Sequence, residues 1–200
     1  MAAALRFAGL GHHLAHDPMD FDEMNNFVEP ILRMWRTGSA DPTVYSGYPG
    51  FFNWLAFVPV GLGQRLAGSY GAYVGGRALV ACFGVANVWL AYRACRAFVG
   101  PGPSLLGAAL MAVSRGSVRA AHAITPDVLV ATATLALLLV VQRATGRRGW
   151  IGAGVLCGAA TAVKYTGLLT LPLLLVGLWL RPERRRSLPI ALAGALVTFG

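Results

Sequence analysis

The chain has 200 residues, of which 56% are hydrophobic and 12% are charged, and its formal net charge is +9. Soluble domains usually carry about one quarter charged residues, so this composition excludes an ordinary water-soluble domain. The positions of the charges also argue against nucleic acid as the partner. Most of the acids precede the first long apolar run, whereas many arginines lie in short breaks between apolar runs.

Residues 1–73 are predicted to form an external loop that carries interfacial amphipathic helices. Its segment 16–26 gathers four carboxylates, including Asp22 and Glu23, near a predicted membrane surface. Clustered carboxylates suggest a site that needs a base or binds a cation. The alternative is a solvated acidic loop whose aspartates cap a helix predicted over about residues 24–35. The spacing of His12, His13 and His16 matches no metal motif such as His-Glu-x-x-His, and we expect no metal.

The stretch from Tyr48 to Phe57 is aromatic and apolar, and its apolar character ends at about Gly63 and Arg65. We interpret it as a helix lying in the membrane interface, where Trp and Tyr are favoured. A transmembrane span is the competing interpretation. It would invert every later loop, and the charge bias disfavours it.

Residues 74–200 are predicted to form a bundle of transmembrane helices. A spanning helix needs about 20 mainly apolar residues. Candidate spans lie at about 74–97, 104–121, 126–142, 149–163, 165–180 and from 187 onward. The fourth and fifth are short and could be a broken or re-entrant pair hinged at Lys164. The predicted fold class is therefore an all-α polytopic membrane helix bundle, and because the last apolar run reaches residue 200, we expect a fragment of a longer protein.

Arginines predict the orientation of this bundle. Those at alternate span ends are Arg93 with Arg96, Arg143 with Arg147 and Arg148, and the group Arg181, Arg184, Arg185 and Arg186. Such ends are expected to be cytoplasmic. The acidic N-terminal segment, residues 114–125 and the corner at Lys164 should then face the opposite side.

Two ionisable residues at the predicted external ends of spans are further candidates. Asp127 follows Arg115, Arg119 and His122, and ionisable groups at membrane depth are often functional. Its alternative role is to favour the start of a helix through the helix dipole. Lys164 is the only lysine and requires an anionic partner there, unless it is a snorkelling lysine at a helix end. The three cysteines, Cys82, Cys95 and Cys157, have no ligand spacing, and we expect no disulfide.

These segments together resemble one known group of proteins. The chain is similar to the superfamily of protein O-mannosyltransferases and lipid A aminoarabinose transferases, membrane glycosyltransferases with the C-type fold. The matching segments are Asp22-Glu23, Tyr48-Pro49-Gly50-Phe51-Phe52, Gly76-Arg77-Ala78-Leu79-Val80, His122 to Asp127, and Lys164-Tyr165-Thr166. The chain departs from the family in lacking the first span, in carrying Asp20-Phe21-Asp22-Glu23 where His-Pro-Asp-Glu is usual, and in having Val163 before Lys164.

The resemblance implies a polyprenyl-phosphate-linked monosaccharide as donor and a hydroxyl of a protein, lipid or glycan as acceptor. Both would meet on the extracytoplasmic face of the plasma membrane. Asp22 is the expected general base of an inverting displacement, with Glu23 as a second catalytic candidate. The expected substrate-binding residues are Arg77, Arg115, Arg119, His122, Asp127, Lys164 and Tyr165, of which the cations would stabilise the leaving phosphate. Neither a nucleotide cofactor nor a metal would then be needed.

Two other functions remain compatible with the sequence. Charged residues in spans and broken helices also mark the pathways of secondary transporters and flippases, although these proteins usually hold them near the midplane. A noncatalytic membrane subunit that retains the fold is the other alternative.

Overall fold

The computed structural model describes residues 1–12, 14, 22–41, 48–180 and 187–199. All regular structure in these ranges is helical, as the sequence predicts. In chain order the elements are α1 (Ala2–Phe7), the π-helical segment η1 (Glu23–Val28), α2 (Glu29–Thr37), α3 (Phe51–Cys95), α4 (Pro101–Val113), α5 (Arg115–Ala120), α6 (Asp127–Arg143), α7 (Arg147–Val163), the 3₁₀ segment η2 (Tyr165–Thr170), α8 (Leu171–Trp179) and α9 (Leu188–Phe199).

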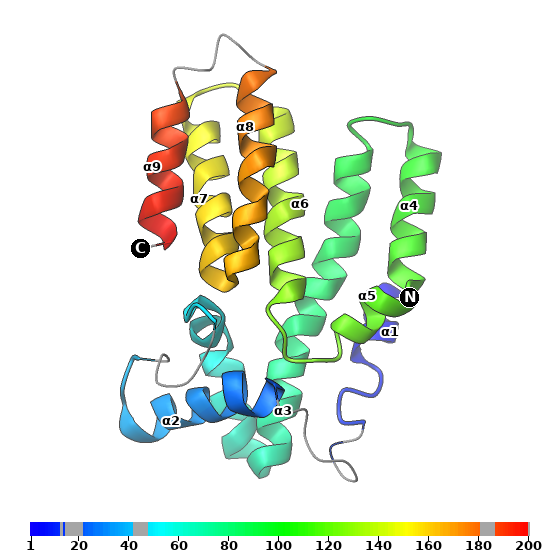
Figure 1. The fold of residues 1–200 in the computed structure, drawn as a ribbon. Coiled ribbons are helices and arrows are strands. Elements are labelled where there is room, and N and C mark those ends of the chain that lie inside the picture. The colour runs from blue at the N-terminus through cyan, green and yellow to red at the C-terminus, as the bar shows by residue number, and fades with distance from the viewer. Residues whose placement is uncertain (13, 15–21, 42–47, 181–186, 200) are drawn as a thin grey trace.

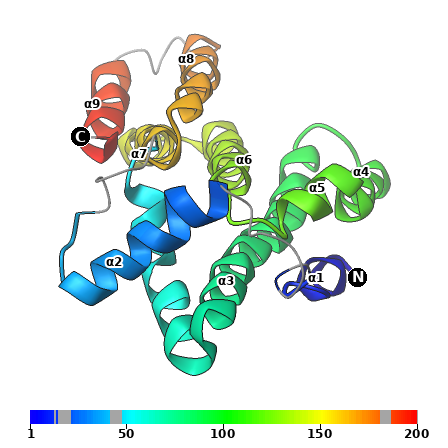
Figure 2. The same ribbon diagram turned by 60° about the horizontal axis from the view of Figure 1, so that its bottom comes forward.

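The longer helices run up and down the molecule. Figure 1 shows α4 and α6 to α9 side by side with the upper part of α3, with the α3–α4 and α6–α7 connections at the top. The N-terminal segment, α2 and the loop between α5 and α6 lie in the lower half. Figure 2 brings this lower end forward and shows α2 lying across it, beside α3. The α3–α4 and α6–α7 connections, which are flanked by arginines, therefore lie at the end opposite α2.

Helix α3 is bent back on itself at Ala67 and Gly68. Gly68 has φ 62° and ψ −151°, a conformation that is essentially restricted to glycine. The two arms, residues 51–66 and 69–95, approach so closely that a Cβ on Gly75 would overlap the Pro59 carbonyl oxygen. The sequence predicts an interfacial helix followed by a separate span from about residue 74. The bend lies between these two predicted elements, and the first arm packs against the second.

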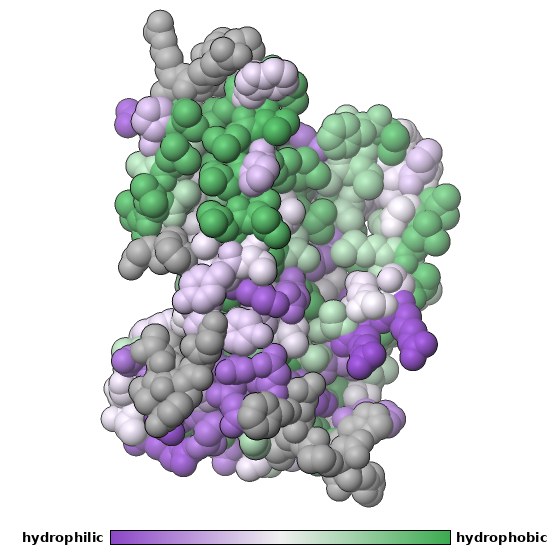
Figure 3. All heavy atoms as spheres, in the orientation of Figure 1, coloured by the Kyte–Doolittle hydropathy of each residue, from purple (hydrophilic) through white to green (hydrophobic). Residues whose placement is uncertain are grey.

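One described helix is long and apolar enough to cross a membrane by length and composition, and it is α3. Its most apolar 18-residue window has a mean hydropathy of 1.5 and is 28% buried. Shorter apolar helices cover Pro101–Val113, Tyr165–Trp179 and Leu188–Thr198. Figure 3 shows hydrophobic residues gathered over the upper part of one face and hydrophilic residues below. Much of this apolar surface is therefore left uncovered by the chain itself.

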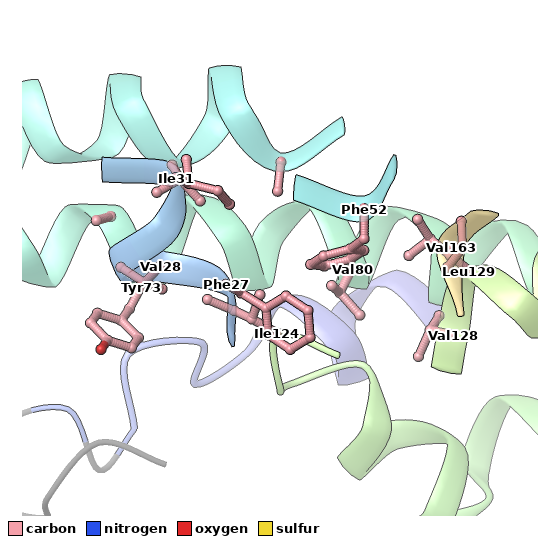
Figure 4. Close-up of a cluster of buried hydrophobic side chains, with 13 residues drawn as sticks. Phe27, Val28, Ile31, Phe52, Tyr73, Val80, Ile124, Val128, Leu129 and Val163 are labelled. Carbon is pink, nitrogen blue, oxygen red and sulfur yellow. The ribbon is translucent and has the colours of Figure 1, made fainter. Parts of the chain in front are cut away.

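Two apolar clusters hold the helices together. The lower cluster joins η1, both arms of α3, the α5–α6 loop, α6 and the end of α7, and Figure 4 shows its side chains, including Phe27, Phe52 and Ile124, converging. The upper cluster surrounds Trp150 between α6, α7, α8 and α9. The lower cluster supports the polar residues described next.

Several predicted boundaries agree with the structure and one does not. Helix α7 ends at Val163 and Lys164 is extended, with φ −157° and ψ 137°, which confirms the predicted hinge. The helix expected over about residues 24–35 is present as η1 followed by α2. The span expected over about 104–121 is interrupted, because extended backbone at Ser114 separates α4 from the short α5.

Candidate functional site

Four polar residues from distant parts of the chain meet at the lower end of α6 and α7. The Lys164 Nζ lies 2.6 Å from Asp127 Oδ1. It also lies 5.7 Å from the centroid of the Tyr48 ring. The Tyr48 hydroxyl donates a hydrogen bond of 3.5 Å to Asp22 Oδ2. We call Asp22, Tyr48, Asp127 and Lys164 the Asp22–Lys164 group.

The hinge after α7 places Lys164. Its carbonyl accepts a 2.7 Å hydrogen bond from the Gly167 amide, which starts η2 directly after the extended residue. A Cβ on Gly167 would overlap the Ala160 carbonyl oxygen, so the reversal needs a glycine there. Asp127 is the first residue of α6 and its carboxylate is 58% exposed, whereas the Lys164 side chain is 22% exposed. The predicted need of Lys164 for an anionic partner is thus met by Asp127.

Asp22 stands immediately before η1, at the position where the helix begins. Its side chain makes no hydrogen bond to the first turn, so capping does not explain it. Instead Asp22 Oδ1 accepts a short hydrogen bond from Asn26 Nδ2, one turn later. Asn26 and Tyr48 thus hold one carboxylate oxygen each, and this fixes the orientation of the Asp22 carboxylate.

Tyr48 connects the carboxylate with the ammonium group. Burial, together with the neighbouring Asp22 carboxylate, raises the pKa of the Tyr48 phenol above its ordinary value. The hydroxyl therefore stays protonated at neutral and mildly alkaline pH and remains a donor to Asp22. The Tyr48 ring packs on Phe27 with centroids 5.4 Å apart, and Phe27 contacts Phe52 of the lower cluster.

Glu23 and Arg77 form a buried ion pair beside this group. The Glu23 side chain is 1% exposed and that of Arg77 is 12% exposed. Arg77 donates to both carboxylate oxygens, at 2.7 and 3.2 Å, and Glu23 Oε1 also accepts the Ile124 amide at 2.6 Å. The remaining Arg77 nitrogen donates to the carbonyls of Leu10 and His12. This pair therefore ties η1 to α3, the N-terminal segment and the α5–α6 loop.

The structure does not bring Arg115, Arg119 and His122 to the Asp22–Lys164 group. Arg119 and His122 line a separate cavity of about 420 Å³ together with Glu23 and Arg77. The His122 ring nitrogens lie 2.8 Å from the carbonyl oxygens of Val118 and Ala8. Arg115 is exposed on α5. Lys164 is the predicted cation that lies beside Tyr48 and pairs with Asp127.

Tyr165 follows Lys164 and is 59% exposed. It lines an apolar cavity of about 400 Å³ between α7, η2 and α9, with Thr161, Leu168 and Leu196 among the other lining residues. The Tyr165 ring thus lines an apolar cavity, whereas the Lys164 ammonium pairs with Asp127.

Sequence reasoning missed the part played by Tyr48 and Asn26. Tyr48 is visible in the sequence only as part of an aromatic segment, and its hydroxyl is the one feature that distinguishes it from the phenylalanines that follow. Asn26 stands four residues after Asp22, a spacing at which side chains on a helix meet. That spacing is the signal that could have identified Asn26.

No three His, Cys, Asp or Glu side chains gather as a metal site among the residues that the structure describes. His13 and His16 lie outside those residues, as do Asp17 and Asp20, so the predicted acidic cluster is described here only from Asp22 onward. Arg181, Arg184, Arg185 and Arg186 also lie outside them.

Comparison with known proteins gives one match. The sequence model of a family described as dolichyl-phosphate-mannose-protein mannosyltransferase matches residues 53–199. The matched range contains Arg77, Asp127 and Lys164, and it begins after Asp22 and Tyr48. No curated protein and no solved structure gives a significant match.

Proposed function

This chain belongs to the dolichyl-phosphate-mannose-protein mannosyltransferase family, and on that premise we propose that it transfers a monosaccharide from a polyprenyl-phosphate donor to an acceptor hydroxyl. The family implies a membrane glycosyltransferase of the mannosyltransferase type. The proposed reaction takes place on the external face of the plasma membrane and inverts the anomeric carbon.

The observation that carries this proposal is that Tyr48 lies beside both Asp22 and Lys164. Transfer from a lipid phosphate needs a base for the acceptor hydroxyl and a cation for the leaving phosphate. Asp22 and Lys164 supply these two functions, and Tyr48 contacts both of them. They come from segments more than a hundred residues apart in the sequence.

In the proposed reaction Asp22 accepts the proton of the acceptor hydroxyl while that oxygen attacks the anomeric carbon. The bond between this carbon and the phosphate oxygen breaks, and its electron pair leaves with the lipid phosphate. Lys164 stabilises the growing negative charge on that phosphate. Asp127 holds the Lys164 ammonium in place, and the Tyr48 and Asn26 donors orient the Asp22 carboxylate.

Glu23 and Arg77 fit a positioning role better than contact with substrate. Both Glu23 oxygens are already occupied by Arg77, and one also by the Ile124 amide. Both His122 ring nitrogens are likewise occupied by carbonyl oxygens, so of the residues that line the adjoining cavity Arg119 is the better candidate to contact sugar or acceptor hydroxyls.

We also propose that the chain is a polytopic bundle in the membrane. Large apolar side chains stay exposed along α4, α8 and α9, among them Leu110, Val176 and Val197. Gly154 and Gly158 of α7 let the α9 backbone approach closely at Ala191 and Ala195, and such small-residue contacts are typical of membrane helices. In water the exposed apolar side chains of these helices would be unfavourable, whereas in a membrane lipid would cover them.

The position of the Asp22–Lys164 group favours an enzyme over a transporter. Transport sites usually lie near the midplane, between broken helices. Here Asp127 is the first residue of α6 and Lys164 follows the last residue of α7, so both lie at helix ends. A site at helix ends suits chemistry on a lipid headgroup.

The test is replacement of Asp22 by Asn in the full-length protein. We expect sugar transfer from a polyprenyl-phosphate-linked mannose to fall at least about 100-fold, with membrane insertion unchanged, because the base is lost and the shape is kept. Glu29→Gln is the matched control, since Glu29 is an exposed acid that pairs only with the exposed Arg36 among the described residues. Lys164→Ala should weaken use of the donor, lowering kcat/KM for the donor, because the charge that grows on the leaving phosphate loses its cation. Transfer retained in Asp22→Asn would remove Asp22 from the mechanism.

A further inference from the structure

Three arginines surround a cavity at the end of the molecule opposite the Asp22–Lys164 group. The cavity has a volume of about 560 Å³ and lies at the α6–α7 connection. Arg143 comes from the last turn of α6, and Arg147 and Arg148 are the first two residues of α7. Leu139 and Val140 contribute its apolar lining. We call this the α6–α7 arginine pocket.

The positive charges around the α6–α7 arginine pocket favour the binding of an anion. Arg147 and Arg148 stand at the N-terminus of a helix, where the macrodipole is positive and cations are disfavoured. The residue before them is Gly146, which has no side chain to accept from the open backbone amides. Within the described ranges, no carboxylate lies within ion-pair distance of any of the three guanidinium groups.

Exposed apolar side chains at this end of the molecule favour a lipid over a free ion as the ligand of the α6–α7 arginine pocket. Further along α7, Ile151 and Val155 are exposed, and so is Trp179 at the end of α8, which lies at the same end of the molecule as the α6–α7 connection (Figure 1). Exposed Trp is favoured at the level of lipid headgroups. An amphiphile could therefore place its phosphate among the arginines and its carbon chains along the adjoining apolar helices.

We propose that the α6–α7 arginine pocket binds the phosphate of an anionic phospholipid. Basic pockets between membrane helices are known to hold such headgroups. Arg93 and Arg96 lie at the same end, at the α3–α4 connection, and do not line the pocket, and Arg93 lies over the Trp89 ring at 5.3 Å.

Three arginines line the pocket and two lie outside it at the same end, so the two sets allow a comparison. The full-length protein is purified into phosphatidylcholine nanodiscs with and without phosphatidylglycerol, and bound lipid is counted by native mass spectrometry. We expect Arg143→Gln/Arg147→Gln/Arg148→Gln to weaken phosphatidylglycerol retention about 100-fold. Arg93→Gln/Arg96→Gln should retain phosphatidylglycerol as the unmodified protein does. Single replacements keep two arginines in the pocket and should each lose about fivefold, which gives a measurement even where the triple variant fails to insert.

Three results would overturn the proposal. An equal loss in both sets of variants would indicate charge attraction without a site, and no loss in either would remove the pocket as a binder. The third is displacement of phosphatidylglycerol by inorganic phosphate at equal concentration, which would show that the ligand is a free anion. The readout is lipid retention and not sugar transfer, so it is independent of the proposed reaction.

Discussion

At the scale of single residues, Tyr48 has two separable contacts, a hydroxyl on Asp22 and a ring beside Lys164. Tyr48→Phe removes the first and keeps the second. We expect the kcat for sugar transfer to fall about tenfold, because a hydrogen bond to a charged group is lost, while the donor KM stays the same. Tyr48→Leu removes both contacts and should also raise the donor KM. Steady-state kinetics with varied donor would measure this difference, and equal kinetics in the two variants would contradict it.

Glu23 differs from Asp22 in how deeply it is buried, and this predicts different consequences of removing the two charges. Glu23→Gln leaves the Arg77 guanidinium in a buried position without its counterion, a change that costs about 3–5 kcal/mol. We expect a clearly lower thermal unfolding temperature in detergent for Glu23→Gln, whereas Asp22→Asn should unfold at the temperature of the unmodified protein. A Glu23→Gln variant of normal stability without transfer would instead place Glu23 in contact with substrate.

Sequence reasoning reached part of this site. An isolated lysine between two apolar runs needs an anion, and Asp127 is that anion. Sequence could not separate Arg115 and Arg119 from the Asp22–Lys164 group, because the positions of charges along the chain predict which end of the molecule they occupy and not which helices are neighbours there. The burial of Glu23 could not be predicted for the same reason, because it depends on the ion pair that Glu23 forms with Arg77 of α3.

At the scale of elements, the close approach of the two arms of α3 depends on glycines. A Cβ on Gly75 would overlap the Pro59 carbonyl oxygen, whereas a Cβ on Gly102 would have no neighbour within 4 Å. We expect Gly75→Ala to destabilise the protein by about 1–3 kcal/mol through overpacking. Gly102→Ala is the matched control and should leave the unfolding temperature within a degree or so, as surface substitutions do. A stability gain in Gly75→Ala would show that the arms separate easily.

The sequence predicts most helices because long apolar runs and the breaks between them are directly visible. The break between about Gly63 and residue 74 is visible too, and the bend at Ala67 and Gly68 lies within it. The reversal of the chain at this bend is not visible, because one glycine in a glycine-rich segment gives no sign of its backbone angles. The end of α4 was missed for a different reason. The buried Arg6 donates to the Met111 and Ala112 carbonyls and to the Ser117 hydroxyl, so a residue of α1 stabilises the boundary between α4 and α5. Burial lowers the pKa of the Arg6 guanidinium.

At the scale of the whole molecule, the two ends differ in chemistry. One end carries the Asp22–Lys164 group and the buried Glu23–Arg77 pair, and the other carries the α6–α7 arginine pocket. Apolar side chains are exposed between them. This arrangement suits a protein whose middle is covered by lipid and whose ends meet two aqueous compartments.

Three cysteine positions test this arrangement in intact cells. Gly116 of α5 and Thr145 of the α6–α7 connection are exposed, and each can be replaced by Cys in a protein whose Cys82, Cys95 and Cys157 are Ala. A membrane-impermeant maleimide should label Gly116→Cys from outside, and Thr145→Cys only after permeabilisation. Cys82, tested as the single natural cysteine, is exposed on α3 within an apolar stretch and should resist labelling until detergent removes the lipid. Rapid labelling of Cys82 without detergent would mean that water, not lipid, covers this face. Labelling of Gly116→Cys and Thr145→Cys from the same side would contradict the proposed positions of the two ends.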